Sequence, residues 1–208
     1  MAAVITVAVV VFMHGRQFGR LPRGERLARI ERSPNYRDGA FRNRDTTIMF
    51  TSDGSFASGL LRFLFGSRRL LRPEAPIPSV RTDLSALDPD DELIVWFGHS
   101  SYLLQTGGRR MLVDPVFVSA SPVWFVNRPF RGADAYGVDD MPPVDILVIT
   151  HDHWDHLDYR TLKRLRERIG RVVCPLGVGE HLERWGFDPD RIYELDWDET
   201  AEPCDGLM

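Results

Sequence analysis

The apolar positions along the chain change their spacing near residue 92. From there to residue 114 they form short runs at 92–98, 101–106 and 109–114, each with the length of a strand. Gly107 and Gly108 separate the last two runs, and such a pair is typical of a two-residue hairpin turn. The pattern therefore predicts three strands, the last two joined as a hairpin.

Strands and helices alternate between residues 144 and 197. Apolar runs predict the strands, whereas apolar residues spaced at i, i+3 and i+7, such as Leu162, Leu165 and Ile169, predict a helix. The expected strands are 144–150, 171–176 and 191–197, and the expected helices are 159–169 and 177–186. This alternation is typical of a parallel sheet, so the fold class that we expect is α/β.

The first 13 residues are apolar throughout and rich in valine. A membrane-spanning helix needs roughly 20 such residues, and no basic residue precedes this run, so neither a full span nor a signal peptide is favoured. Two interpretations are open, a clipped membrane anchor and a buried β-strand. As an anchor, residues 1–13 would leave the rest of the chain cytoplasmic, because arginines follow them directly.

A basic, loop-rich arm is expected over residues 14–90, ahead of a domain at 91–208. Between residues 15 and 72 there are 13 arginines and 5 acidic residues, although the formal net charge of the whole chain is −4. A basic segment that follows an apolar one favours contact with an anionic membrane surface.

Within this arm the sequence predicts little regular structure. Leu27 and Ile30 indicate one short helix, which ends at Ser33-Pro34-Asn35. Residues 51–90 contain several prolines and one apolar patch at 60–65, so we expect an extended segment that packs on the domain.

Composition narrows the class of protein. With 208 residues, 43% hydrophobic and 27% charged, the chain is one globular domain or a large part of a bigger one. Its negative net charge gives no electrostatic reason to expect a nucleic-acid partner. Cys174 and Cys204 stand alone, which excludes a disulfide framework and a zinc ribbon; Cys174, in an apolar run, is expected to be buried.

The candidate chemistry lies directly after the apolar run at 144–150, in the sequence HDHWDH at residues 151–156. In extended chain His151 and His153 project to the same side and are placed to bind one cation, and Asp155 and His156 beyond the bend are placed to reach a second. Neutral imidazole and carboxylate suit Zn²⁺, and iron or manganese also fit. A lone histidine after a strand is usually only a polar loop residue, but three histidines with a carboxylate indicate a metal site.

The pattern H-x-H-x-D-H resembles the metallo-β-lactamase superfamily. Further segments resemble the branch that contains N-acylphosphatidylethanolamine-hydrolysing phospholipase D and ascorbate-6-phosphate lactonase. These segments are WFGHSS at 96–101, LVDPVF at 112–117, PVD at 143–145, PLGVG at 175–179, ELDW at 194–197 and the arm at 18–43. The last three favour the phospholipase D side.

The resemblance implies a role for each site residue. It makes His151 and His153 ligands of a first metal ion, and Asp155 and His156 ligands of a second, with Asp155 also orienting the attacking hydroxide. Asp114 would steady the histidine loop from behind, and His99 would lie in a turn near the site, where a purely structural turn histidine is an equal alternative.

The implied activity is that of a metal-dependent hydrolase, with two Zn²⁺ ions and a metal-bound hydroxide that attacks a phosphodiester of the N-acylphosphatidylethanolamine type. Its partner would be a phospholipid at a membrane surface, or a small phosphorylated substrate if the chain is instead a sugar-phosphate lactonase.

The superfamily fold is an αβ/βα sandwich of two halves, and this chain resembles the N-terminal half. After His156 the only further histidine is His181, which lies in an amphipathic segment and is expected to be structural. We therefore expect one sheet face to lie uncovered, and the missing half to come from a longer protein, a partner chain or a second copy. The alternative is an inactive metal-binding fragment.

Two tryptophans near the motif, Trp154 and Trp124, have two interpretations. Large aromatic side chains usually belong to the core, which is the reading that we favour. The alternative is that they line a groove for lipid.

Overall fold

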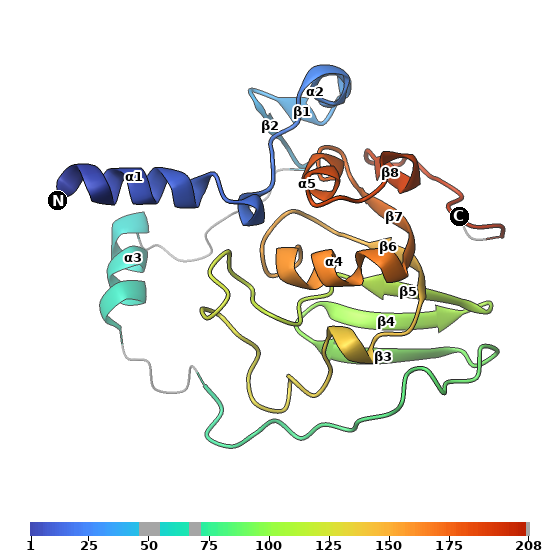
Figure 1. Ribbon diagram of the computed structural model, residues 1–208. Coiled ribbons are helices and arrows are strands. Elements are labelled where there is room, and N and C mark those ends of the chain that lie inside the picture. The colour runs from blue at the N-terminus through green and yellow to red at the C-terminus, as the bar shows by residue number, and fades with distance from the viewer. Residues whose placement is uncertain (46–54, 67–71, 207–208) are drawn as a thin grey trace.

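A six-stranded sheet forms the centre of the computed structural model, which describes residues 1–45, 55–66 and 72–206 (Figure 1). The strand order follows the sequence. The strands are β3 (Leu93–Gly98), β4 (Ser101–Thr106), β5 (Arg109–Val113), β6 (Val144–Val148), β7 (Ile169–Pro175) and β8 (Ile192–Leu195). β3, β4 and β5 pair antiparallel, and β5 to β8 pair parallel, so the expected α/β class is confirmed.

The β4–β5 hairpin forms as predicted. Gly107 and Gly108 both have positive φ, +54° and +70°, and the register pairs Thr106 with Arg109 directly across the turn. Two successive left-handed residues match the twist of the two strands, and glycine adopts that conformation without strain from a side chain.

One face of the sheet forms the core beneath α4 (Tyr159–Leu165) and α5 (Gly179–Arg184). The registers of neighbouring strands line up one row of apolar side chains across the whole sheet. This row is Val95, Leu103, Leu112, Leu147, Val172 and Ile192. Leu162 and Leu165 of α4 and Leu182 of α5 are fully buried in the same cluster.

The predicted helix at 159–169 is too long. α4 ends at Leu165, a 3₁₀ turn covers Arg166–Arg168, and Ile169 already opens β7. The next residue, Gly170, lies so close to β6 that an added Cβ would be 2.7 Å from the carbonyl oxygen of Asp145. The helix therefore ends at Leu165, although the apolar spacing continues to Ile169, because Ile169 and Gly170 pair closely with β6.

The opposite face of the sheet is exposed at its β3 edge. Ile94 and Trp96 alternate with the core residues of β3, and 66% and 69% of their surfaces are open to solvent. Towards the middle of the sheet Ile146 is buried.

The first 13 residues contain α1 (Ala2–Met13), so the β-strand interpretation is wrong. α1 extends away from the body of the molecule, with the N-terminus at its tip (Figure 1). Among the described residues, no helix combines the length and the apolar character needed to cross a bilayer.

The arm contains more regular structure than its sequence predicts. The expected short helix is α2 (Gly24–Arg32), and a small hairpin of β1 (Tyr36–Arg37) and β2 (Ala40–Phe41) follows it. The expectation of an extended segment fails at α3 (Phe56–Phe65), which is a helix; residues 51–54 and 67–71 of that segment lie outside the described part.

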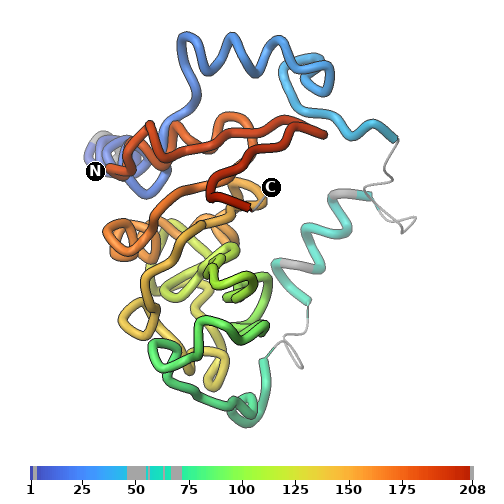
Figure 2. The backbone as a smooth tube through the Cα atoms, turned by 90° about the vertical axis from the view of Figure 1, so that its right-hand side faces the viewer, coloured from blue at the N-terminus to red at the C-terminus, as the bar shows by residue number. Residues whose placement is uncertain are grey.

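Arg26 of α2 fastens the arm to the domain. Its guanidinium donates to Glu180 at 2.6 Å, Glu183 at 2.5 Å and Glu194 at 2.6 Å, from α5 and β8. Burial opposes the charge on Arg26, but the hydrogen bonds that its guanidinium donates to three carboxylates outweigh this effect and raise its pKa. Figure 2 shows the segment that contains α2 running alongside these C-terminal elements.

Replacing Arg26 should destabilise the fold. Arg26→Ala leaves Glu180 and Glu194, whose side chains are 8% and 9% exposed, without their shared cation. We expect a loss of about 3 kcal/mol in the free energy of unfolding, as is usual when one partner of a buried ion pair is removed. Arg29→Ala is the matched control, because the Arg29–Glu199 pair is exposed and should contribute less than about 1 kcal/mol. Equal losses in urea unfolding of the two variants would contradict this assignment.

Candidate metal centre

The site forms where the parallel strands β5 and β6 end side by side. Asp114 directly follows β5, and its backbone N–H donates to Val148 at the end of β6 at 3.0 Å. The HDHWDH segment follows β6 two residues later. The carboxyl ends of neighbouring parallel strands are where α/β sheets place their ligand sites.

Asp114 is buried, and its carboxylate holds the neighbouring side chains of the site in place. Its side chain is 1% exposed, and its backbone adopts the left-handed conformation, with φ of +41°. One carboxylate oxygen accepts the backbone N–H of Thr150 at 2.8 Å; the other accepts the Thr150 hydroxyl at 2.6 Å and pairs with Nδ1 of His156 at 2.8 Å. The bond to Asp114 places the proton of His156 on Nδ1. The lone pair of Nε2 is then free to coordinate a metal ion.

The three histidines of the motif gather around this anchor. The ring of His151 lies 3.8 Å from that of His156 and 4.6 Å from that of His153, measured between centroids. The structure therefore brings the predicted imidazoles together instead of spreading them over the surface.

Asp155 lies next to a histidine from another part of the chain. Oδ2 of Asp155 is 3.1 Å from Nε2 of His99, in the β3–β4 turn, and 3.9 Å from Nε2 of His156. The donor atoms of these three residues all lie within 4.8 Å of one another. His151 and His153 are neighbours of this group through ring contacts and are not part of it.

The protonation states suit a cation. Burial, reinforced by the positive charge that His156 and His153 carry when protonated, lowers the pKa of His151, which keeps its ring neutral near pH 7. Burial alone would raise the pKa of Asp155, but a backbone hydrogen bond and the neighbouring His156 and His99 lower it, so the carboxylate stays ionised. Neutral imidazole and ionised carboxylate are the metal-binding forms, so this donor set fits a divalent ion.

A family comparison agrees with this geometry. Residues 109–208 match the model of a β-lactamase superfamily domain. This part of the chain belongs to the metallo-β-lactamase superfamily.

Relatives of this superfamily member are bacterial and animal proteins. The protein Mb0930 of Mycobacterium bovis is 42% identical over 175 residues, which are 83% of this chain and 47% of that protein. N-acyl-phosphatidylethanolamine-hydrolyzing phospholipase D 1 of Caenorhabditis elegans is 30% identical over 51% of this chain and 32% of its own length. A UPF0173 metal-dependent hydrolase of Thermodesulfovibrio yellowstonii is 27% identical over 48% of this chain and 34% of its own.

A solved structure is also similar: CmlA, a diiron β-hydroxylase from Streptomyces venezuelae, has a TM-score of 0.40 and 35% identity over 55% of this chain and 22% of CmlA. The chain spans about half the length of the mycobacterial relative.

Some of the residues that shape this superfamily site carry little signal in the sequence. Thr150 bridges Asp114 and His151, its hydroxyl lying 3.0 Å from Nδ1 of His151. Ser100, beside His99, places its hydroxyl 3.0 Å from Nδ1 of His156. A polar residue between an apolar strand and the motif is the only hint of Thr150, and Ser100 is recognised only through the fold.

Two expectations about neighbouring aromatic residues are wrong. Trp154 and Trp124 are 44% and 50% exposed, so neither belongs to the core. Both lie in loops, Trp124 after β5 and Trp154 after β6.

Cys174, expected to be buried, and His181, expected to be structural, are both placed as expected. Cys174 is buried, and burial raises the pKa of its thiol. His181 lies outside the site and accepts the backbone N–H of Arg20 at 3.0 Å.

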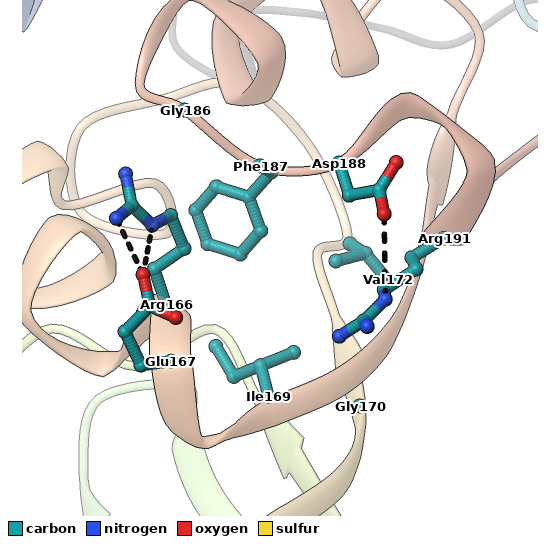
Figure 3. Close-up of a pocket in the computed structure, with 9 residues that line it drawn as sticks. All are labelled: Arg166, Glu167, Ile169, Gly170, Val172, Gly186, Phe187, Asp188 and Arg191. Carbon is teal, nitrogen blue, oxygen red and sulfur yellow. Dashed lines mark hydrogen bonds and ion pairs between the residues drawn. The ribbon is translucent and has the colours of Figure 1, made fainter.

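A cavity of about 310 Å³ lies away from the metal site (Figure 3). Ile169 and Gly170 at the start of β7 line it, so it opens at the opposite edge of the parallel strands. Its arginines have acidic partners: Arg166 pairs with Glu167 and Arg191 pairs with Asp188.

Asp114→Asn should weaken metal binding while leaving the fold in place. Asparagine keeps the size of the side chain but loses the charge that holds His156, and loss of such a supporting partner lowers metal affinity by about 10–100-fold. Zn²⁺ titration against a chelating indicator measures the change. Asp145→Asn is the control, because Asp145 contacts Arg109 and Arg110 at the other end of the strands. Wild-type affinity in Asp114→Asn would disprove the role of this contact.

Proposed function

We propose that this chain carries the metal-binding half of a metal-dependent hydrolase whose substrate is a phosphodiester of the N-acylphosphatidylethanolamine type. The observation that carries the proposal is the convergence of the motif imidazoles and Asp155 beside a buried Asp114, a donor set that fits divalent ions. The relative from Caenorhabditis elegans, named for that hydrolysis, supports the substrate class.

In this proposal each residue of the site has a defined task. His151 and His153 hold one ion, Asp155 and His156 hold the second, and Zn²⁺ is the ion that we propose. Bound metal would lower the pKa of a water molecule towards about 7 and offset negative charge that develops on the phosphate.

The remaining work falls to the chain's own side chains. Asp114 keeps the proton of His156 on Nδ1, so that Nε2 stays available. Oδ2 of Asp155 is placed to accept a hydrogen bond from the attacking water and to orient it. Attack on phosphorus would release N-acylethanolamine and leave phosphatidate, with water supplying the new oxygen.

Hydrolysis assays with this chain and added Zn²⁺ test the proposal. Release of N-acylethanolamine from mixed micelles should require metal, stop on chelation, and fall about 1,000-fold in kcat/KM for His151→Ala, equivalent to about 4 kcal/mol. His14→Ala is the control, since His14 is an exposed residue at the end of α1.

Two results would contradict the proposed function in different ways. Turnover of a sugar-phosphate lactone but not of the lipid would replace the substrate class. Tight metal binding without any turnover would identify the chain as an inert metal-binding fragment and overturn the hydrolase proposal for it.

We further propose that α1 inserts into one leaflet of a membrane. Its valines are exposed on every side, which suits an apolar solvent and not a one-sided protein groove. Twelve residues of helix span about 18 Å, close to half of a hydrocarbon core roughly 30 Å thick. Arg16 and Arg23 follow, where anionic headgroups would lie.

An aromatic chain connects α1 to the metal loop. Phe12 of α1 contacts Phe18 edge to face at 5.1 Å, and Phe18 contacts Trp154 at 6.0 Å, measured between ring centroids. Because Trp154 lies between His153 and Asp155, insertion of α1 would hold the site close to the lipid surface.

Charges placed on α1 should release the chain from vesicles. The double variant Val7→Asp, Val11→Asp puts two carboxylates on the exposed helix. Loss of two valine side chains that would be buried in lipid by itself weakens membrane partitioning by about 3 kcal/mol, or roughly 100-fold. Co-sedimentation with phosphatidylserine-containing vesicles measures this. Val80→Asp, at an even more exposed position outside α1, should bind like the wild type. Unchanged sedimentation of the double variant would exclude α1 as the anchor.

The exposed sheet face at β3 is a surface on which the second half of the family's sandwich could pack. We propose that Ile94 and Trp96 are covered by that half, whether it belongs to a longer form of the same protein, to a partner chain or to a second copy. The additional metal ligands of the family would arrive with it.

A further inference from the structure

The turn that carries His99 is held in an unusual conformation. Gly98 and His99 both have positive φ, +110° and +48°, and the pairing of β3 with β4 shifts register between Trp96 and Gly98. A left-handed conformation costs a residue with a side chain about 1–2 kcal/mol, so the surrounding contacts must impose it. Trp96 does so by donating its indole N–H to the carbonyl oxygen of His99 at 2.9 Å.

This turn directs the ring of His99 to the metal loop. Its Nε2 faces Oδ2 of Asp155 at 3.1 Å, and its ring centroid is 5.1 Å from that of His156. The two residues are 56 positions apart, so strand pairing and not local sequence creates the contact.

Three possible metal-ligand atoms, from His99, Asp155 and His156, therefore lie close together. Nδ1 of His156 is occupied by Asp114, and its Nε2 lies on the side of Asp155. Oδ2 of Asp155 thus lies 3.1 Å from one imidazole nitrogen and 3.9 Å from the other, and all three donor atoms lie within 4.8 Å of one another. Two ligands of one tetrahedral Zn²⁺ ion lie roughly 3.4 Å apart, because each is about 2.0–2.1 Å from the metal, so small side-chain rotations would close the set.

We propose that His99 is a metal ligand, and that His99, Asp155 and His156 together bind one divalent ion within this chain. The proposal rests on the proposed function, because it assigns a third protein ligand to one of the two ions. It differs from the motif assignment in that one ligand comes from the β3–β4 turn. A histidine that only orients Asp155 through a hydrogen bond is the alternative that the test must exclude.

Two substitutions at His99 separate these roles. His99→Gln keeps a side-chain amide that reaches Asp155 and donates a hydrogen bond, but amides bind Zn²⁺ poorly. His99→Asn is shorter and accommodates the left-handed backbone, so it preserves the turn. His14→Gln removes an exposed histidine elsewhere and serves as the control.

The experiment is titration of the full chain with Zn²⁺ against a chelating indicator, with the visible spectrum of bound Co²⁺ as a second readout. Far-UV circular dichroism without metal establishes that each variant is folded. Both His99 variants should lose affinity for one ion by about 100-fold or more, beyond the 10–100-fold typical of supporting residues, and should show a weaker Co²⁺ spectrum. His14→Gln should match the wild type.

The outcomes distinguish this inference from the proposed function. If His99→Gln binds like the wild type, His99 is a hydrogen-bond partner or a bystander and the inference is overturned, while metal binding that still depends on His156 would leave the proposed function standing. If the wild-type chain binds neither Zn²⁺ nor Co²⁺, both proposals fall together.

Discussion

The bond between the carboxylate of Asp114 and the ring of His156 is the contact on which the rest of the site depends. A buried carboxylate is tolerated only when hydrogen bonds replace its water, and here Thr150 and His156 supply them. The carboxylate follows β5 and its partners follow β6, so formation of the parallel pair and formation of the site are one event. A shift of either strand by one residue would turn Asp114 to the other face of the sheet.

The ion-pair network around Arg26 has a comparable role for the arm. It fixes the position of the positive segment relative to the domain, together with further contacts such as the hydrogen bond from the backbone N–H of Arg20 to His181. With it, α2 is joined to α5 and β8, and the stretch between α1 and α2 is held by Trp185, whose indole donates to the carbonyl oxygen of Arg16 at 2.7 Å. The apolar helix and the metal loop are therefore parts of one structure, which is why a membrane function for α1 bears on the site.

How far the sequence predicted this structure differs from one element to the next. Strands were predicted well, because a short apolar run bounded by turn or polar residues leaves few alternatives, and the turn at Gly107-Gly108 fixed one register. The end of α4 was misjudged because the close packing of Gly170 on β6 cannot be read from periodicity. α3 was missed because Gly59 within it lowers helix propensity and prolines follow. The exposure of Trp154 depends on where its loop lies, which no local pattern specifies.

Some residues of the candidate site could also be predicted from the sequence, and others could not. The motif histidines and Asp155 were identifiable because six consecutive residues carry them, and Asp114 because the segment around it resembles the superfamily branch. The position of His99 required the fold: its contact with Asp155 depends on a strained turn and on strand pairing.

The most direct test of the account is a crystal structure of the chain soaked in Zn²⁺, with anomalous diffraction recorded at the zinc edge. We predict two anomalous peaks, one beside His151 and His153 and one beside Asp155 and His156, with Asp114 still bonded to His156. Side chains that point into separate surroundings, with no peak between them, would contradict it.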